Sequence, residues 1–232
     1  SRSVSRCEIM RRISRRMFLA VIAAVAANTG YCLEPRKRFP FFEPVKPPRH
    51  VQSMVHRGLM MLAPENTEPA IQACIDDGIE WVEIDIQLTH DGNHIVFHNS
   101  QLEGKTNGQG AVNNQTLDKL LKLDAGGWVA SRYQGVHLYS LSDVFAFAKG
   151  KINLYLACKK VDPAKLVREV RAAEMEKQVI VYDQPSTIAA IRKLSGGTIP
   201  VMTKFRIGMD FQKFMTEVGS NAVEINAEEI SS

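Results

Sequence analysis

The chain has 232 residues, of which 45% are hydrophobic and 23% are charged, an ordinary composition for a globular protein. Its net charge of +4 comes from the first 32 residues, where six arginines accompany one acid; the other 200 residues hold 23 basic and 24 acidic side chains. The body of the chain therefore lacks the basic surplus typical of nucleic-acid binding, and we expect no nucleic-acid partner.

The N-terminus has the three parts of a cleavable export signal. Ser14-Arg15-Arg16-Met17-Phe18-Leu19 fits the twin-arginine pattern, an apolar run at 17–27 follows it, and small residues occupy 24–26. A membrane anchor is the alternative, but eleven apolar residues fall short of the roughly 20 that span a bilayer. We therefore predict an export signal over residues 1–29, with leader residues before Met10, and a periplasmic or extracellular protein.

The segment after this signal is rich in proline. Residues 33–50 hold five of the ten prolines and show no apolar periodicity. Proline removes backbone donors and favours extended conformations, so we predict a Pro-rich linker over residues 30–50. A single folded domain at 51–232 follows, because α/β barrels commonly have about 200–250 residues in one domain.

From residue 51 onward, short β-like runs alternate with amphipathic helical patterns. Single helices between strands indicate βα units and a parallel sheet. The pattern predicts strands at 53–56, 81–88, 152–159, 179–183, 199–205 and 222–226, and helices at 66–77, 141–148, 163–173, 186–194 and 210–218. A further extended run at 93–98 precedes a Gly- and Asn-rich insertion at 99–138, which contains a small helix at 116–123.

The number of strands limits the fold class. A (β/α)8 barrel closes with eight strands, whereas the pattern supplies six strands that are joined by helices. The sequence ends at Ser232, where a sixth helix would develop. We predict an α/β, TIM-barrel-like (β/α)8 domain that is truncated after about six strands; an open six-stranded sheet is the alternative.

Candidate catalytic residues follow the first predicted strand. His56-Arg57-Gly58 ends this strand, and the C-terminal ends of strands form the active face of parallel α/β folds. A histidine at this place can transfer a proton near neutral pH, and an adjacent arginine can bind phosphate with two hydrogen bonds. A single histidine at a strand end would more simply make a structural hydrogen bond.

His56 has chemically matched partners further along the chain. Glu83 and Asp85 are two residues apart in a predicted strand, so both carboxylates share one face. Two inward-facing acids repel each other unless a cation offsets their charge, which favours a divalent metal with oxygen ligands, Mg²⁺ or Ca²⁺; a solvated polar face is the alternative. His98 ends the next extended run and supplies a second proton-transfer group, whereas His94, beside a turn, is predicted to lie on the surface.

These motifs resemble the glycerophosphodiester phosphodiesterase family in their order and spacing. The resemblance is carried by His56-Arg57-Gly58, Pro64-Glu65-Asn66-Thr67, Glu83-Ile84-Asp85 with Thr89 and Asp91-Gly92 behind it, and a strand that ends in His98. It implies a (β/α)8 phosphodiesterase barrel that acts on a small glycerophosphodiester with a divalent metal.

The resemblance also implies roles for individual residues. His56 and His98 would be the catalytic acid–base pair, Arg57 and Lys159 would bind phosphate, and the pair Glu83 and Asp85 would bind the metal. The insertion at 99–138 would help to enclose a glycerol-like headgroup. Peripheral membrane association is a further expectation, and the sequence does not predict an oligomeric state.

The sequence departs from the family pattern at three places. Ala157 stands where the family has an acid that serves as a third metal ligand, and Asn99 stands where an aspartate is usual. The last two strands of the family have no counterpart before Ser232. Glu224 is a candidate replacement for the missing acid only if its side chain projects inward.

We therefore expect a metal-dependent phosphoric diester hydrolase of lipid metabolism, which releases an alcohol and glycerol 3-phosphate by histidine acid–base catalysis. Two alternatives stay open. One is a related phospholipase-type enzyme that forms a cyclic phosphate. The other is a catalytically impaired protein that still binds the headgroup, because Ala157 leaves the predicted metal site without one acid.

Overall fold

A computed structural model of the chain describes residues 52–226 and residue 228. The predicted export signal at 1–29 and the predicted linker at 30–50 lie outside these residues. No helix in the described part has both the length and the apolar character needed to cross a membrane.

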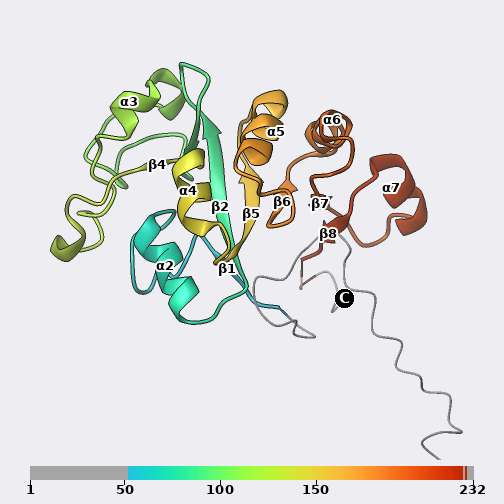
Figure 1. Ribbon diagram of the computed structural model, residues 1–232, viewed down its shortest axis with the longest axis horizontal. Helices are drawn as coiled ribbons and strands as arrows, with labels where there is room; N and C mark the ends of the chain where they lie inside the picture. Colours follow the sequence, from blue (N-terminus) through green and yellow to red (C-terminus); the bar gives the residue numbers. More distant parts are fainter. Residues whose placement is uncertain (1–51, 227, 229–232) are drawn as a thin grey trace, which may run out of the picture. The chain divides into compact units, whose positions relative to one another are not determined.

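Six parallel strands form the main sheet (Figure 1). They pair in the order β1-β2-β5-β6-β7-β8, and their bounds are Met54–His56, Trp81–Leu88, Asn153–Cys158, Val179–Tyr182, Val201–Lys204 and Ala222–Glu224. Within the described residues β1 and β8 do not pair with each other, so the sheet is not closed. These findings confirm the predicted TIM-barrel-like α/β fold with six strands in βα order.

Two short antiparallel strands extend this sheet beside β2. Strand β3 (His94–Val96) pairs with β2, and β4 (Tyr139–Ser140) pairs with β3. The extended run predicted at 93–98 is therefore a strand over three residues, and it leads into the insertion.

Five helices connect or flank the parallel strands: α2 (Glu68–Asp76), α4 (Leu141–Ala148), α5 (Pro163–Ala172), α6 (Pro185–Ser195) and α7 (Phe211–Val218). Local sequence sets several of their ends. Ser140 and Asp143 form a capping box that begins α4, and the Asp162 carboxylate accepts two backbone N–H groups at the start of α5. Gly196, in the left-handed region with φ 64°, ends α6.

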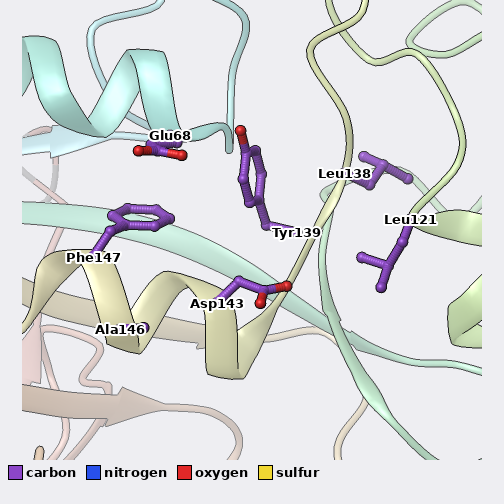
Figure 2. A pocket seen from close by; sticks show the side chains of 7 residues that line it. All are labelled: Glu68, Leu121, Leu138, Tyr139, Asp143, Ala146 and Phe147. Atoms are coloured by element: carbon purple, nitrogen blue, oxygen red, sulfur yellow. The ribbon is translucent and has the colours of Figure 1, made fainter.

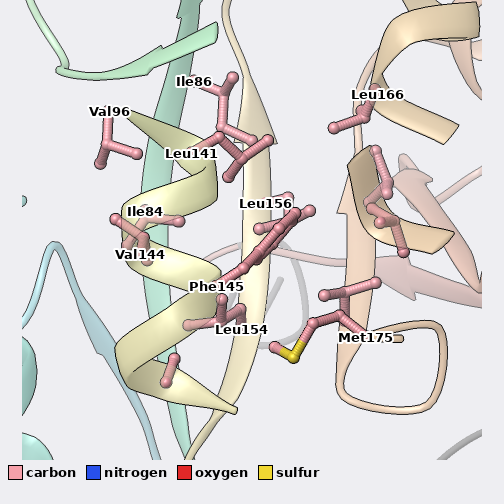
Figure 3. Close-up of a cluster of buried hydrophobic side chains, with 14 of the residues drawn as sticks. Ile84, Ile86, Val96, Leu141, Val144, Phe145, Leu154, Leu156, Leu166 and Met175 are labelled. Atoms are coloured by element: carbon pink, nitrogen blue, oxygen red, sulfur yellow. The ribbon is translucent and has the colours of Figure 1, made fainter. Parts of the chain in front are cut away.

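The main hydrophobic core lies between the sheet and its helices (Figure 3). Ile84 and Ile86 of β2 and Leu156 of β5 meet Val144 and Phe145 of α4, and all five side chains are at most 1% exposed. Burial of each such side chain contributes about 1.5–3 kcal/mol. Because strand side chains alternate, the core on this face leaves Glu83 and Asp85 on the opposite face.

That opposite, inner face carries a smaller apolar cluster. Trp81, Tyr155, Ile180 and Met202 pack together there from four neighbouring strands. The acids therefore lie beyond a short apolar floor, toward the C-terminal ends of the strands.

The insertion at 99–138 has a hydrophobic core of its own. It contains a 3₁₀ turn at Val112–Asn114, helix α3 at Leu117–Leu120 and a second 3₁₀ turn at Ser131–Tyr133. Seven buried residues hold it to the end of β3: Ile95, Phe97, Leu102, Val112, Leu120, Ala125 and Leu138. Helix α3 is shorter than the helix predicted at 116–123, because the chain turns after Leu120.

The prediction that His94 lies on the surface is wrong. Its side chain is buried, its Nδ1 lies 2.5 Å from Glu169 Oε2, and its Nε2 accepts a hydrogen bond from the Asp162 backbone N–H. Helix α5 covers β3 at this point, so the imidazole joins the insertion strand to α5. The turn beside His94 gave no sign of this long-range packing.

Candidate active site

Five of the six predicted site residues meet toward the C-terminal ends of β1, β2 and β5. His56 is the last residue of β1 and lies in register with Glu83 of β2. The His56 Nε2 atom is 3.8 Å from Glu83 Oε2, and the His56 side chain is 60% exposed while that of Glu83 is 6% exposed. This pair therefore combines a histidine that solvent can reach with a buried carboxylate.

A strained turn after β1 aims Arg57 into the site. The Arg57 backbone has a φ of 57°, which is uncommon for a residue with a side chain. Its N–H donates to both the backbone O and the carboxylate Oε2 of Glu83, each at 3.0 Å. The guanidinium then lies 3.2 Å from Asp85 Oδ2 and 3.4 Å from Glu65 Oε1.

Gly58 permits this turn, and its replacement by alanine should destabilise the protein. Its φ is +83°, and an added Cβ would lie 2.8 Å from the Ala70 Cβ and 2.9 Å from the Ala70 carbonyl carbon. Backbone strain alone costs about 1–3 kcal/mol, and the clash with α2 adds to it. Gly92→Ala is the matched control, since Gly92 has a φ of +72° and open space around it. In urea unfolding, Gly58→Ala should lose more stability than Gly92→Ala; equal losses would contradict the predicted clash.

Asp85 is the most enclosed acid of the site. Its side chain is 0% exposed, with Arg57 on Oδ2 and Lys159 Nζ 3.1 Å from Oδ1. These are ion pairs rather than well-directed hydrogen bonds, because neither Asp85 Oδ1 nor Arg57 Nε has a hydrogen-bond partner. Arg57 and Lys159, the predicted phosphate ligands, therefore both contact Asp85. A bound phosphate would share these two cations with that acid.

Asn66 holds Asp85 in place, a role that sequence reasoning missed. The Asn66 amide donates to Asp85 Oδ2 at 2.9 Å, and the Asp85 backbone N–H donates to Asn66 Oδ1 at 3.1 Å. Asn66 is 1% exposed and has a φ of 58°, in the left-handed region that asparagine tolerates best after glycine. The Pro64-Glu65-Asn66-Thr67 motif drew attention to this segment of the sequence, but its spacing does not reveal that Asn66 contacts Asp85.

Glu83 has a strongly altered proton affinity. Burial, followed by the charge of Asp85, raises the pKa of Glu83 to about 7. The Arg57 backbone N–H and the charges of Lys159 and Arg57 act in the opposite direction without cancelling the rise. Glu83 therefore exchanges a proton in the physiological range, which is typical of functional sites.

His98 joins the site through the loop after β3. The Gln87 amide donates to three successive carbonyls, of Phe97, His98 and Asn99, at 2.6–3.0 Å. The His98 Nδ1 atom is 2.8 Å from Asn99 Oδ1, so the departure at position 99 keeps a polar partner for the imidazole.

The two histidines lie within electrostatic reach of each other. Burial is the largest cause that lowers the pKa of His56, the charge of Arg57 is the next, and the charges of His98 and Lys159 act in the same direction, whereas Asp85 opposes them. The structure thus joins five of the six predicted residues by direct contacts, and His98 acts on His56 through its charge.

A further cation comes from the insertion. Lys105 Nζ is 3.1 Å from Glu65 Oε2 and 3.7 Å from the ring centroid of Trp128. Glu65 therefore bridges Lys105 and Arg57, and it ties the insertion to the β1–α2 loop. Lys105 lies in a stretch without periodicity, so the sequence gave no signal for it.

A model of the glycerophosphoryl diester phosphodiesterase family matches residues 56–199, which is more than half of the chain. The chain belongs to this family. The matched range begins at His56 and contains all six candidate site residues, and membership confirms the resemblance found in the sequence.

Curated relatives of the family match part of the chain. A glycerophosphodiester phosphodiesterase of Caldanaerobacter subterraneus is 31% identical over 139 residues, which cover 55% of this chain and 56% of the relative. One of Bacillus subtilis is 29% identical over 142 residues, which cover 58% of this chain and 48% of the relative. The chain thus spans about half the length of the curated relatives it matches.

Solved structures of phosphodiesterases share the fold. An Oleispira antarctica phosphodiesterase in complex with the product sn-glycerol-3-phosphate gives a TM-score of 0.64 at 25% identity, covering 78% of this chain and 79% of that chain. A glycerophosphodiester phosphodiesterase of Agrobacterium tumefaciens gives 0.54 at 22% identity, covering 75% of this chain and 96% of that chain.

In this member of the glycerophosphoryl diester phosphodiesterase family, Glu83 and Asp85 are the two carboxylates that could hold a metal ion. Ala157 lies in register with Asp85 on the neighbouring strand and is 6% exposed, so no acid extends the pair on that side. Glu224 of β8 does face inward, but Tyr155 donates to it at 2.9 Å and Tyr182 at 3.4 Å. Among the described residues no three His, Cys, Asp or Glu side chains group to hold an ion.

The oxygen atoms of Glu83 and Asp85 therefore suit a cation that few protein groups bind. Glu83 and Asp85 offer hard oxygens on one face, and the buried Asp85 Oδ1 has no hydrogen-bond partner. Mg²⁺ is commonly held by one or two carboxylates, with water and substrate phosphate completing its coordination. The pair suits that arrangement, and it does not form an all-protein cage.

A separate cavity of about 560 Å³ lies beside α2 and α4 (Figure 2). Seven residues line it: Glu68, Leu121, Leu138, Tyr139, Asp143, Ala146 and Phe147. The rings of Tyr139 and Phe147 meet edge to face there, with centroids 5.9 Å apart. None of the six candidate site residues lines this cavity, so it is distinct from the candidate active site.

Proposed function

We propose that this chain hydrolyses glycerophosphodiesters to an alcohol and glycerol 3-phosphate. One observation carries the proposal: a histidine, two buried acids and two cations contact one another toward the C-terminal ends of β1, β2 and β5, and the charge of His98 acts on that histidine. Family membership and the glycerol phosphate complex of the Oleispira relative support the substrate class.

Arg57 and Lys159 would bind the phosphate. Both already contact Asp85, and Lys159 is 43% exposed at the mouth of the site. An incoming phosphodiester would place its negative oxygens between these cations. Their charge would then stabilise the additional negative charge that develops as the new oxygen–phosphorus bond forms.

His56 and His98 would transfer the protons. The lowered pKa of His56 favours the neutral imidazole at neutral pH, which is the form that accepts a proton from the attacking oxygen. His98 would donate a proton to the leaving alkoxide, and the Gln87 amide holds the loop that carries it. Glu83, 3.8 Å from His56, would stabilise the imidazolium that forms on that ring.

Glu83 and Asp85 would hold a divalent cation, Mg²⁺ or Ca²⁺. When bound, such an ion polarises a phosphoryl oxygen and neutralises phosphate charge. Asp85 would have to share its oxygens between the ion and its two basic partners, so we expect this chain to bind the ion weakly until a substrate phosphate adds further ligands.

Metal affinity should depend on pH because of Glu83. Below its pKa of about 7 this carboxyl carries a proton, which a cation must displace. The apparent affinity for Mg²⁺ should therefore fall by up to about tenfold for each pH unit below 7 and level off above it. Calorimetry in buffers of different ionisation enthalpy measures both the affinity and the proton release. Glu83→Gln should abolish the pH step, and a flat wild-type profile across neutrality would contradict the assignment.

The function is tested by incubating the full chain with glycerophosphocholine and Mg²⁺ or Ca²⁺. Phosphorus NMR identifies the product, and glycerol 3-phosphate is expected. A cyclic phosphate would instead indicate the phospholipase-type reaction. Intact diester after prolonged incubation with either ion would refute the hydrolase proposal.

Headgroup binding without turnover is the second candidate. Ala157 favours it, because within the described part of the chain the site offers a cation two carboxylates and no third. Saturable binding of glycerophosphocholine in the absence of any product would support it.

Export of the chain through the segment at 1–29 remains a proposal, which N-terminal sequencing of the secreted form would test.

A further inference from the structure

Exposed apolar side chains gather on the loop between β1 and α2. Met60, Met61 and Leu62 are 44%, 92% and 56% exposed, and they lie a few residues after the catalytic candidate His56. Backbone hydrogen bonds to Leu59 from Leu62 and Ala63 fold this loop into a tight turn. The turn thus presents Met61 to solvent on an ordered backbone, whereas methionine is usually among the buried residues.

The insertion adds a second apolar group beside this loop. Trp128 and Val129 are 42% and 37% exposed. The hydroxyl of Tyr133 donates to the carbonyl of Leu62, which joins the two segments directly. We call Met60, Met61, Leu62, Trp128 and Val129 the apolar rim.

A chain of side-chain contacts links the apolar rim to the candidate active site. Lys105 stacks on the ring of Trp128 and pairs with Glu65, and Glu65 in turn pairs with Arg57. Three successive contacts therefore lead from Trp128 to the proposed phosphate ligand. A surface that binds the apolar rim would lie at the mouth of the site.

Basic groups accompany the apolar rim. The Lys105 ammonium lies over Trp128, and the exposed Arg132 lies over the ring of Tyr133, with its guanidinium carbon 4.8 Å from the ring centroid. Tryptophan with aliphatic side chains and flanking cations is the combination that suits the interface of an anionic lipid layer. Contiguous exposed apolar residues on a protein surface typically mark such an interaction site.

We propose that the apolar rim docks on an anionic lipid surface and brings the active-site mouth to it. The consequence for substrates rests on the proposed function. The docked site would then hydrolyse lysophospholipids, which are glycerophosphodiesters that keep one acyl chain. Water would add across the same phosphorus–oxygen bond, giving the headgroup alcohol and an acylated glycerol phosphate. The lipid surface holds the acyl chain, and the enzyme binds only the polar part.

Trp128 can report the docking itself. The chain has two tryptophans, and the other, Trp81, is 8% exposed, so Trp81→Phe leaves one fluorophore at the apolar rim. On addition of vesicles made of equal parts phosphatidylcholine and phosphatidylglycerol, its emission should shift to the blue and intensify. This local signal is preferable to co-sedimentation, because the basic and apolar segment at 1–29 would itself sediment with vesicles.

Substitutions in the same background identify the contact. Met61→Asp should weaken the vesicle-induced signal by about tenfold or more in apparent affinity, the scale expected for losing one buried methionine. Leu194→Asp on α6, where the leucine is 46% exposed, is the matched control and should leave the signal unchanged. An emission spectrum that vesicles do not alter would overturn the proposal, and so would equal losses in the two variants.

Activity separates this proposal from the proposed function. If both hold, Met61→Asp should hydrolyse lysophosphatidylglycerol in vesicles about tenfold more slowly than the parent chain and soluble glycerophosphocholine at the same rate. A chain that docks but cleaves neither diester would refute the hydrolase function and leave the docking in place. A chain that cleaves glycerophosphocholine without any change in Trp128 emission would refute the docking alone.

Discussion

Replacing His56 by alanine should lower the rate of glycerophosphodiester hydrolysis by about 10²–10⁴-fold, the usual contribution of a positioned acid–base group. Because the His56 side chain is 60% exposed, its removal opens no cavity in the core, and the fold should stay intact. Initial rates with glycerophosphocholine, together with the thermal midpoint of each protein, measure the two effects separately.

His90 provides the matched control for His56. It is an exposed histidine in the turn after β2, and none of the candidate site residues contacts it among the interactions described. His90→Ala should keep the wild-type rate, and His98→Ala should resemble His56→Ala. The double variant His56→Ala/His98→Ala should be little slower than either single variant, since residues that act as one unit are not additive. A His56→Ala protein that works at the His90→Ala rate would remove the central support for the mechanism.

Replacing Ala157 by aspartate should couple the stability of the protein to divalent cations. The new carboxylate would lie beside Asp85, on a position that is 6% exposed. Without a cation, an uncompensated buried charge costs about 3 kcal/mol, which corresponds to a fall of about 6–12 °C in Tm. Added Mg²⁺ or Ca²⁺ should restore most of this loss, because three carboxylates on one face bind a hard cation better than two.

Ala157→Asn separates charge from size in this experiment. It has nearly the same shape as aspartate, and its Tm should respond little to divalent cations. Scanning fluorimetry of both variants, with and without each ion, gives the comparison. If Ala157→Asp and Ala157→Asn have equal midpoints, or if cations raise neither, the two-carboxylate description of the site is wrong.

Strong periodicity made most of the fold predictable from the sequence. The bounds predicted for the strand at 81–88 and the helix at 141–148 match β2 and α4, because an alternating run and a capping box define those segments. The insertion was less predictable, since its glycines and asparagines form turns whose stability depends on contacts with β3. His94 was misplaced for the same reason: burial by α5 is a long-range effect that neighbouring residues do not encode.

The candidate site was predictable as a set of residues but not as a network of contacts. Motif spacing selected His56, Arg57, Glu83 and Asp85, and the parallel strand register then placed them together. Asn66 orients Asp85 by hydrogen bonds, and its own backbone is in the left-handed region. Sequence spacing reveals neither the contact nor this backbone conformation. The ion pairs of Arg57 were likewise hidden, since phosphate binding and carboxylate binding require the same side chain.

The Gln87 side chain holds the backbone around His98 independently of the insertion that follows it. Its two amide hydrogens are shared among the carbonyls of Phe97, His98 and Asn99, so β2 fixes the backbone that carries His98. Apart from Asn99, the insertion lies beyond this anchor, and its own core keeps it together. A change in the length or surface of the insertion should therefore leave His98 where β2 holds it.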